Sequence, residues 1–271
     1  MPHDPRTVLD RSAARPDLVL RWASVATHGA DGLADVYLPG LAGSAVPAGV
    51  VIALHGGFWR RAFDRRHLRP LAIALRDTGR VVVVPEYRRP TPAGGWRVIL
   101  DDVRALRAEL MPLLTDTVPD QVDSVPPILL GHSAGGQLAI WWALEATGSP
   151  DRPSRVVALA PVADLVRAHA DDLGGGAVRN LFGGEPSQQP GATAMLDVAA
   201  RLRAGERVGR LVVVHGAEDR QVPVEHSAAL ARDVGSVDLQ ILPGIEHFGL
   251  IDPLGPAWPQ VLGTLGSSRR R

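Results

Sequence analysis

The sequence predicts an α/β protein built on a mostly parallel central sheet flanked by helices. Short apolar runs with strand character alternate with segments whose apolar residues recur at helical spacing. Runs such as Val50–Leu54 and Val81–Val84 are apolar without interruption, which is typical of strands buried on both faces of a parallel sheet. An alternation of strand and helix favours right-handed crossover connections between neighbouring parallel strands.

The expected elements follow one another in a regular order. The first two strands, near Leu18–Ala26 and at Leu33–Leu38, are separated by the short turn THGADG and predict an antiparallel hairpin at a sheet edge. Further strands are expected at Val50–Leu54, Val81–Val84, Ile128–Leu130, Val156–Leu159, Leu211–Val214 and Leu239–Leu242. Helices are expected at Leu68–Thr78, Trp96–Leu114, Gln137–Ala146, Glu225–Val234 and Ala257–Leu265.

One stretch, residues 162–208, interrupts this alternation. It has no strand-like run and contains DDLGGGAVRNLFGGEPSQQPGAT, which is rich in glycine and proline. A plain connection of this length is uncommon inside a compact domain. We therefore expect a single domain over residues 1–271 with a lid or cap inserted at 162–208.

The composition excludes several classes of chemistry. The 29 basic and 29 acidic residues cancel, so there is no electrostatic footprint for binding nucleic acid. Every basic residue is arginine, which excludes a lysine nucleophile, and the absence of cysteine excludes thiolate chemistry and disulfides. No histidine pair has metal-ligand spacing, so no metal site is expected.

The N-terminal segment MPHDPRTVLDRSAARPD lacks the apolar core of a signal peptide. No apolar run approaches the roughly 18 residues that a membrane span needs. We therefore expect a cytoplasmic protein with no membrane partner.

The segment LLGHSAGGQLAIWW predicts a sharp strand-to-helix turn at Ser133 that exposes the serine hydroxyl. Side chains two residues before and after the serine would collide, which explains Gly131 and Gly135. The N–H of Ala134 and the positive end of the following helix would then face a developing oxyanion. A tight turn with an inert serine is the alternative interpretation.

A serine nucleophile needs a base, and the base needs an orienting carboxylate. In a strand–turn–helix hydrolase both follow the serine on later loops, with the acid first. The loop HGAEDRQVP offers Glu218 and Asp219, and the loop PGIEHFGLIDP offers His247. The alternative for His247 is a buried, hydrogen-bonded structural histidine.

The loop HGGFW directly follows the predicted strand Val50–Leu54. Gly56 and Gly57 would let backbone N–H groups turn toward the serine and complete an oxyanion hole. Phe58 and Trp59 either line the substrate pocket or pack the loop against the sheet. His132, the variable residue of the serine turn, is a further candidate for contact with substrate.

Other notable residues are expected to be structural. His55 and His215, at the ends of strands, would brace loops through hydrogen bonds to the backbone. Trp141 and Trp142 would pack behind the serine turn. Asp164 would cap a helix, and a position facing the site is the alternative.

Over nearly its whole length the chain resembles the α/β-hydrolase superfamily. HGGFW resembles the corresponding loop of kynurenine formamidases and related small esterases more than the HGGG loop of hormone-sensitive-lipase-type esterases. Four later segments also resemble motifs of this superfamily. PEYRRPTPAGGWRVILDDVRAL resembles the segment after the next strand, and the nucleophile, acid and base motifs are resembled, in that order, by GHSAGGQLA, HGAEDRQVP and EHFGLIDP.

The resemblance implies an α/β-hydrolase fold and assigns the roles at the site. It implies Ser133 as nucleophile, His247 as base, and Asp219 as the acid in preference to Glu218, because the family places the acid three residues before Val-Pro. It implies oxyanion donors from Ala134 and from Gly57, with Gly56 and Phe58 as alternatives to Gly57.

These expectations describe a serine hydrolase that cleaves small carboxylic esters or amides through an acyl-enzyme without a cofactor. An aryl formamidase acting on N-formylkynurenine is the specific alternative. A prolyl-oligopeptidase-like peptidase would need a large extra domain, and a non-catalytic binding protein would not need the Ser–Asp–His order. Whether the chain forms a homodimer is left open.

Overall fold

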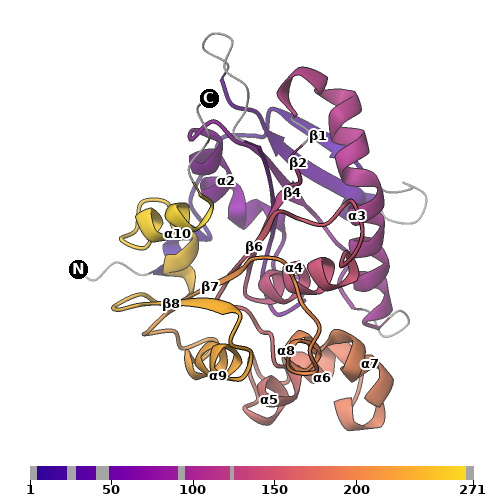
Figure 1. Cartoon of the computed structure of the whole chain (residues 1–271). Coiled ribbons are helices and arrows are strands. Elements are labelled where there is room, and N and C mark those ends of the chain that lie inside the picture. The colour runs from indigo at the N-terminus through magenta and orange to yellow at the C-terminus, as the bar shows by residue number, and fades with distance from the viewer. Residues whose placement is uncertain (1–4, 23–28, 41–48, 91–94, 123–124, 267–271) are drawn as a thin grey trace.

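The computed structural model describes residues 5–22, 29–40, 49–90, 95–122 and 125–266, and in them eight strands form one sheet (Figure 1). The strand order across the sheet is β1-β2-β4-β3-β5-β6-β7-β8. The strands are β1 (Leu18–Arg21), β2 (Leu33–Tyr37), β3 (Val50–Leu54), β4 (Val81–Pro85), β5 (Ile128–His132), β6 (Arg155–Leu159), β7 (Leu211–Gly216) and β8 (Val237–Leu242).

The sheet is parallel except at one edge. β1 pairs antiparallel with β2, and β2 pairs antiparallel with β4, while every other neighbouring pair is parallel. The predicted fold class and edge hairpin are therefore confirmed. β1 ends at Arg21, and residues 23–26 of the first predicted strand lie outside the described residues.

Helices cover both faces of the sheet. One face carries α3 (Arg97–Thr117), α4 (Ala134–Glu145) and α9 (Glu225–Asp233), and the other carries α2 (Arg69–Arg76) and α10 (Trp258–Thr264). Short 3₁₀ helices lie at Pro5–Val8, Gly29–Gly32, Arg65–Leu68, Pro119–Gln121, Pro186–Gln188 and His247–Ile251.

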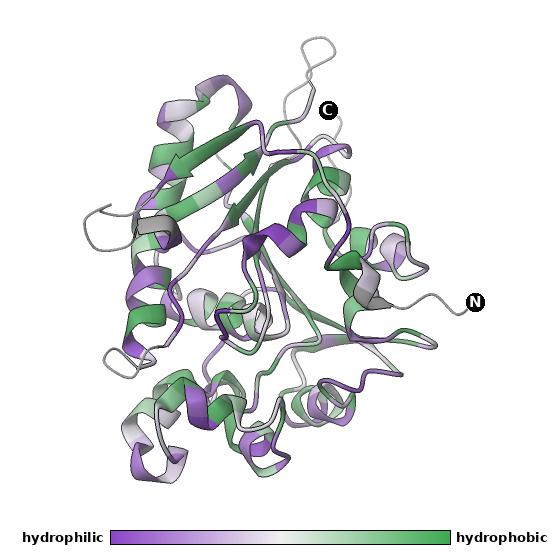
Figure 2. Ribbon diagram, turned by 180° about the vertical axis from the view of Figure 1, so that it is seen from behind, coloured by the Kyte–Doolittle hydropathy of each residue, from purple (hydrophilic) through white to green (hydrophobic). Residues whose placement is uncertain are grey.

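Alternate residues of each central strand enter two separate apolar cores. In β3, Ile52 and Leu54 pack under α3 and α4, whereas Val51 and Ala53 pack under α2. The strands in the middle of the sheet are hydrophobic along their length, and the outer helices mix both residue types (Figure 2). Burial on both faces is why the strand sequences are uninterrupted apolar runs.

The segment from 162 to 208, called the cap segment below, connects β6 to β7 and is fully described. It folds into α5 (Leu165–Ala170), α6 (Ala177–Phe182), α7 (Pro190–Leu196) and α8 (Val198–Arg203), which lie together at one end of the molecule (Figure 1). Asp164 caps α5 by accepting from the Arg167 N–H, as predicted. The movement of this segment as a lid stays a prediction.

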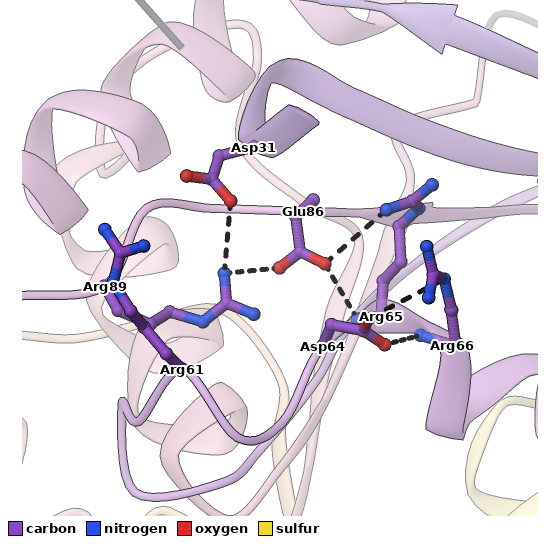
Figure 3. Close-up of a pocket in the computed structure, with 7 residues that line it drawn as sticks. All are labelled: Asp31, Arg61, Asp64, Arg65, Arg66, Glu86 and Arg89. Carbon is purple, nitrogen blue, oxygen red and sulfur yellow. Dashed lines mark hydrogen bonds and ion pairs between the residues drawn. The ribbon is translucent and has the colours of Figure 1, made fainter. Parts of the chain in front are cut away.

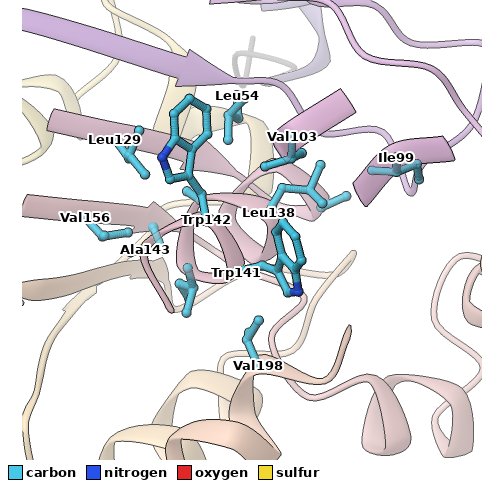
Figure 4. Close-up of a cluster of buried hydrophobic side chains, with 14 of the residues drawn as sticks. Leu54, Ile99, Val103, Leu129, Leu138, Trp141, Trp142, Ala143, Val156 and Val198 are labelled. Atoms are coloured by element: carbon cyan, nitrogen blue, oxygen red, sulfur yellow. The ribbon is translucent and has the colours of Figure 1, made fainter. Parts of the chain in front are cut away.

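The helix that follows the serine turn, α4, is buried between the sheet and the cap segment. Trp141 and Trp142 are 1% and 3% exposed, which confirms that both side chains pack in the core. Figure 4 shows Trp141 on the side of Val198 in the cap segment. Its indole Nε1 donates to the carbonyl of Met195 at 3.1 Å, so α4 fixes the cap segment to the sheet.

Candidate active site

Ser133 lies in a strained turn between β5 and α4. Its φ is +56°, in the left-handed region that side chains rarely adopt. The turn is held because the Ser133 N–H donates to the carbonyl of Leu159 at 2.8 Å and its carbonyl accepts from the Gly136 N–H at 2.9 Å. A strained backbone that surrounding bonds over-determine is typical of functional sites.

The glycines around Ser133 let β5, α4 and β3 approach closely. A Cβ atom on Gly131 would lie 2.2 Å from the carbonyl oxygen of Gly135, and one on Gly135 would lie 2.1 Å from that of Leu54. Both distances are far inside van der Waals contact. The collision expected from the sequence is therefore confirmed, and α4 begins at Ala134 directly after the serine.

A histidine and a carboxylate meet at the carboxyl ends of β7 and β8. His247 Nδ1 lies 2.6 Å from Asp219 Oδ2, and both side chains are buried. Asp219 Oδ1 accepts from the N–H groups of Gln221 at 2.8 Å and Val222 at 2.9 Å. The neighbouring Glu218 is exposed, so the structure brings Asp219 to the histidine.

The environment of Asp219 keeps its carboxyl group ionised. Burial would raise the pKa of Asp219, but hydrogen bonds from His215 and His247 outweigh burial and hold the pKa well below its ordinary value. His247 Nδ1 must then donate to this carboxylate, which leaves Nε2 as the ring nitrogen that can accept a proton.

His215 and His55 brace loops, as predicted. His215 Nε2 donates to the carbonyl of Val222 at 2.8 Å, and its Nδ1 lies 2.7 Å from Ser227 Oγ. His55 Nδ1 donates to the carbonyl of Gly56 at 2.8 Å.

His132 connects the serine turn to the loop that holds His247. Its Nε2 donates to the carbonyl of His247 at 3.1 Å, and the two ring centroids are 4.5 Å apart. Burial holds the pKa of His132 well below its ordinary value, so the ring is neutral. The side chain is 2% exposed, and its contact with substrate stays a prediction.

The loop after β3 lies directly against the serine. A Cβ atom on Gly56 would be 2.9 Å from the Cβ atom of Ser133, so only glycine fits there. Gly57, Phe58 and Trp59 have φ values of +113°, +51° and +55°. Three consecutive residues with positive φ turn the peptide groups of this loop away from a regular strand path, and the oxyanion hole that the sequence predicts here stays a prediction.

Phe58 and Trp59 differ in their surroundings. Trp59 is buried in the core that α3 and α4 share with the sheet, whereas Phe58 is half-buried and packs against Gly174 of the cap segment. Both border a cavity of about 200 Å³, which is also lined by Arg60, Arg61, Pro90, Asn180 and Leu181. A contact of either side chain with substrate stays a prediction.

Sequence reasoning missed Glu86, which directly follows β4. Its Oε1 lies 2.8 Å from His55 Nε2, and its Oε2 accepts from the Arg65 N–H at 3.0 Å. Figure 3 shows Glu86 between Arg65 and Arg89 in a charged pocket beside the loop after β3. The only sequence signal for a contact between Glu86 and His55 was a carboxylate directly after a predicted strand, and the sequence does not show that this strand lies beside β3.

Within the residues that the structure describes, no group of three or more His, Cys, Asp or Glu side chains could hold a metal ion. None of the helices in those residues is long and apolar enough to cross a membrane.

The chain resembles known proteins in sequence. The BD-FAE family model matches residues 34–234. A monoacylglycerol lipase of Mycolicibacterium smegmatis is 28% identical, in an alignment that covers 74% of this chain and 81% of the lipase.

Solved structures of esterases share the fold. Esterase B from Lactobacillus rhamnosis, inhibited by a tributyrin phosphonate, has a TM-score of 0.74 at 20% identity, with 97% of this chain and 89% of the esterase covered. The butyrate-bound esterase Est2 from Thermogutta terrifontis has a TM-score of 0.64 at 18% identity, with 92% and 91% covered. These likenesses confirm the α/β-hydrolase fold that the sequence resemblance implies.

Proposed function

The chain belongs to the BD-FAE family, as an esterase- or lipase-like hydrolase of the α/β-hydrolase superfamily, and we propose that it cleaves small carboxylic esters through a serine-bound acyl-enzyme. The observation that carries this proposal is the buried contact of 2.6 Å between His247 Nδ1 and Asp219 Oδ2. The strained turn of Ser133 and the glycine loop packed against it support the same assignment.

In the proposed reaction His247 Nε2 takes the proton of the Ser133 hydroxyl as the oxygen attacks the ester carbonyl. Asp219 holds the imidazole in the required tautomer and stabilises the imidazolium that forms. The N–H groups of Gly57 and Ala134 donate to the developing oxyanion. Each such donor contributes about 3 kcal/mol to stabilisation of the transition state.

The tetrahedral intermediate collapses when the ester C–O bond breaks and His247 gives its proton to the leaving alcohol. Water then enters, and His247 removes a proton from it as it attacks the acyl carbonyl. A second tetrahedral intermediate releases the carboxylic acid and restores the Ser133 hydroxyl. The cycle needs only the protein's own groups and water.

The comparisons favour an ester as substrate. The relatives and neighbours include a monoacylglycerol lipase and an esterase solved with butyrate. The formamide alternative drawn from the HGGFW resemblance has no such support and is therefore an outcome of the test.

The test compares kcat/KM for p-nitrophenyl acetate, p-nitrophenyl octanoate, a monoacylglycerol and N-formyl-L-kynurenine, with Ser133→Ala as the blank. We expect at least one ester to exceed about 10⁴ M⁻¹s⁻¹, the lower range for real substrates, and the blank to be inactive. Faster formamide than ester cleavage would replace the proposal with the formamidase. Turnover of none of the four, or turnover that survives in Ser133→Ala, would refute it.

A further inference from the structure

Both ring nitrogens of the buried His55 face hydrogen-bond acceptors. Nδ1 lies 2.8 Å from the carbonyl oxygen of Gly56, and Nε2 lies 2.8 Å from Glu86 Oε1. A carbonyl oxygen can only accept, so Nδ1 must carry a hydrogen atom. The charge of His55 is then decided by which partner holds the hydrogen between Nε2 and Glu86.

Glu86 is surrounded by donors that favour its ionised form. Its Oε2 accepts from the Arg65 N–H at 3.0 Å, and its Oε1 lies 2.5 Å from Arg89 Nη1. The Arg65 N–H and the Arg89 guanidinium both contact this carboxylate, so its ionised form is favoured without any assumption about the charge of His55. Burial would raise the pKa of Glu86, but hydrogen bonding and nearby positive charge outweigh it and lower the pKa to about 2. An ionised carboxylate only accepts, so Nε2 of His55 also carries a hydrogen atom.

We infer that His55 is an imidazolium paired with the Glu86 carboxylate, and that its Nδ1–H bond to the Gly56 carbonyl sets the direction of the oxyanion-hole peptide. The carbonyl of Gly56 and the N–H of Gly57 belong to one planar peptide group and point in opposite directions. Because His55 holds the carbonyl, the Gly57 N–H is directed away from His55, in a loop that packs against Ser133. The inference rests on the proposed function, in which this N–H donates to the oxyanion.

Tyr87 holds the imidazolium and the preceding peptide. Its ring stacks on His55 with centroids 4.3 Å apart and an interplanar angle of 9°, a geometry that favours a cation over the aromatic face. Its hydroxyl donates to the carbonyl of His55 at 2.7 Å. Tyr87 therefore holds the carbonyl of His55, and His55, held by Glu86, holds the carbonyl of Gly56. Two residues of the PEYRR segment thus fix the loop after β3.

A further titratable neighbour of His55 is His67, whose ring meets it edge-on with the ring centroids 5.6 Å apart. Burial lowers the pKa of His67 to about 3, so this ring is neutral and does not repel the imidazolium at neutral pH. His55 is thus a positioning residue: it acts on the reaction through the Gly56–Gly57 peptide and touches no reacting atom.

Two substitutions at His55 separate its two hydrogen bonds. His55→Asn places an amide nitrogen near the position of Nδ1 and can still donate to Gly56, whereas His55→Gln places one near Nε2 and can reach only Glu86. We expect His55→Gln to lower kcat for p-nitrophenyl acetate about 100-fold, as for loss of one oxyanion donor, with KM changed less than threefold. His55→Asn should lose no more than about tenfold.

The matched control is His169→Gln in the cap segment, because His169 pairs with Glu185 at a partly exposed position. Its kcat should equal that of the wild type. Thermal unfolding midpoints of all three variants show whether each one folds. A folded His55→Gln variant that keeps kcat within threefold of the wild type would overturn the positioning role.

Nitrogen-15 NMR of the wild type tests the charge without relying on activity. The signal of His55, assigned by its loss in His55→Gln, should show both ring nitrogens protonated at pH 7, and Glu86→Gln should convert it to a neutral ring. One unprotonated nitrogen in the wild type would refute the imidazolium. If the wild type hydrolyses no ester, the proposed function fails while the NMR result still decides the charge of His55.

Discussion

Two buried histidine–carboxylate pairs lie near Ser133, and they differ in the use of the second ring nitrogen. Asp219 meets His247 Nδ1 at 2.6 Å, and Glu86 meets His55 Nε2 at 2.8 Å. In His55 the other nitrogen is committed to a backbone carbonyl, whereas in His247 it is the nitrogen that serves the serine in the proposed reaction. The same two side-chain types can therefore hold a loop or move a proton, depending on that nitrogen.

The carboxylates of the two pairs are also stabilised differently. Asp219 accepts from the backbone N–H groups of its own turn, at Gln221 and Val222. Glu86 instead lies within an ion cluster, 2.5 Å from Arg89 Nη1 and 3.6 Å from Arg65 Nη1. The carboxylate of Asp219 therefore fixes the tautomer of His247. The carboxylate of Glu86 balances the positive charges of the arginines around it.

The largest effect should come from Asp219→Asn. An asparagine amide would favour the wrong tautomer of His247, and we expect kcat to fall about 10⁴-fold. The measurement is steady-state hydrolysis of p-nitrophenyl acetate, with circular dichroism to check the fold. A loss below tenfold would mean that the Asp219–His247 pair is not the proton-transfer pair.

The next largest effect should come from Gly57→Ala. We expect kcat to fall about 10²- to 10³-fold, which is typical of losing an oxyanion donor. The φ of Gly57 is +113°, and a Cβ atom there would lie 2.3 Å from the Phe63 side chain, so the peptide must move. Gly191→Ala, where a Cβ atom meets nothing within 4 Å, is the matched control and should keep full activity. Equal rates for the two variants would contradict the assignment of this loop.

Glu86→Gln should separate stability from rate. A neutral His55 can keep its bond to Gly56 while the new amide donates to Nε2, so we expect kcat to fall less than tenfold. Removing one partner from a buried ion cluster leaves uncompensated charge, which should lower the free energy of unfolding by about 3–5 kcal/mol. Urea unfolding at pH 7 measures the loss of stability. A fall in kcat as large as that of Asp219→Asn would contradict the view that Glu86 holds a loop and takes no part in proton transfer.

The smallest effect is a dependence of stability on pH. The folded state lowers the pKa of Glu86 from 4.5 to about 2, so its contribution is present above about pH 4.5 and is lost as the pH falls toward 2. The contribution is about 3 kcal/mol at neutral pH. Unfolding free energies measured from pH 6 to pH 2.5 should fall more steeply for the wild type than for Glu86→Gln, and parallel curves would contradict the assignment.

Local patterns were enough to predict the sheet and the serine turn. The strands are uninterrupted apolar runs because both faces are buried, and Gly131 and Gly135 are required by contacts within a few residues or with the adjacent strand. Asp219 and His247 could be placed because each follows a recognisable strand. Boundaries shifted where polar residues lie on an edge, as in β8, which begins at Val237 instead of Leu239.

Contacts between distant segments could not be predicted. Glu86 meets His55 only because β4 pairs with β3, and the sequence does not state which strands are neighbours. His132 donates to a carbonyl 115 residues later. The helices of the cap segment have six or seven residues, too few to show a helical period, and Asp197 caps α8 while also accepting from the Leu165 N–H of α5.

The central claim is that Ser133 is the nucleophile. Mass spectrometry of the protein after reaction with a fluorophosphonate, followed by peptide mapping, tests it most directly. The account predicts one adduct per chain, on Ser133, and no adduct in folded Ser133→Ala. An adduct on another residue, or an unlabelled wild-type protein that is folded, would contradict it.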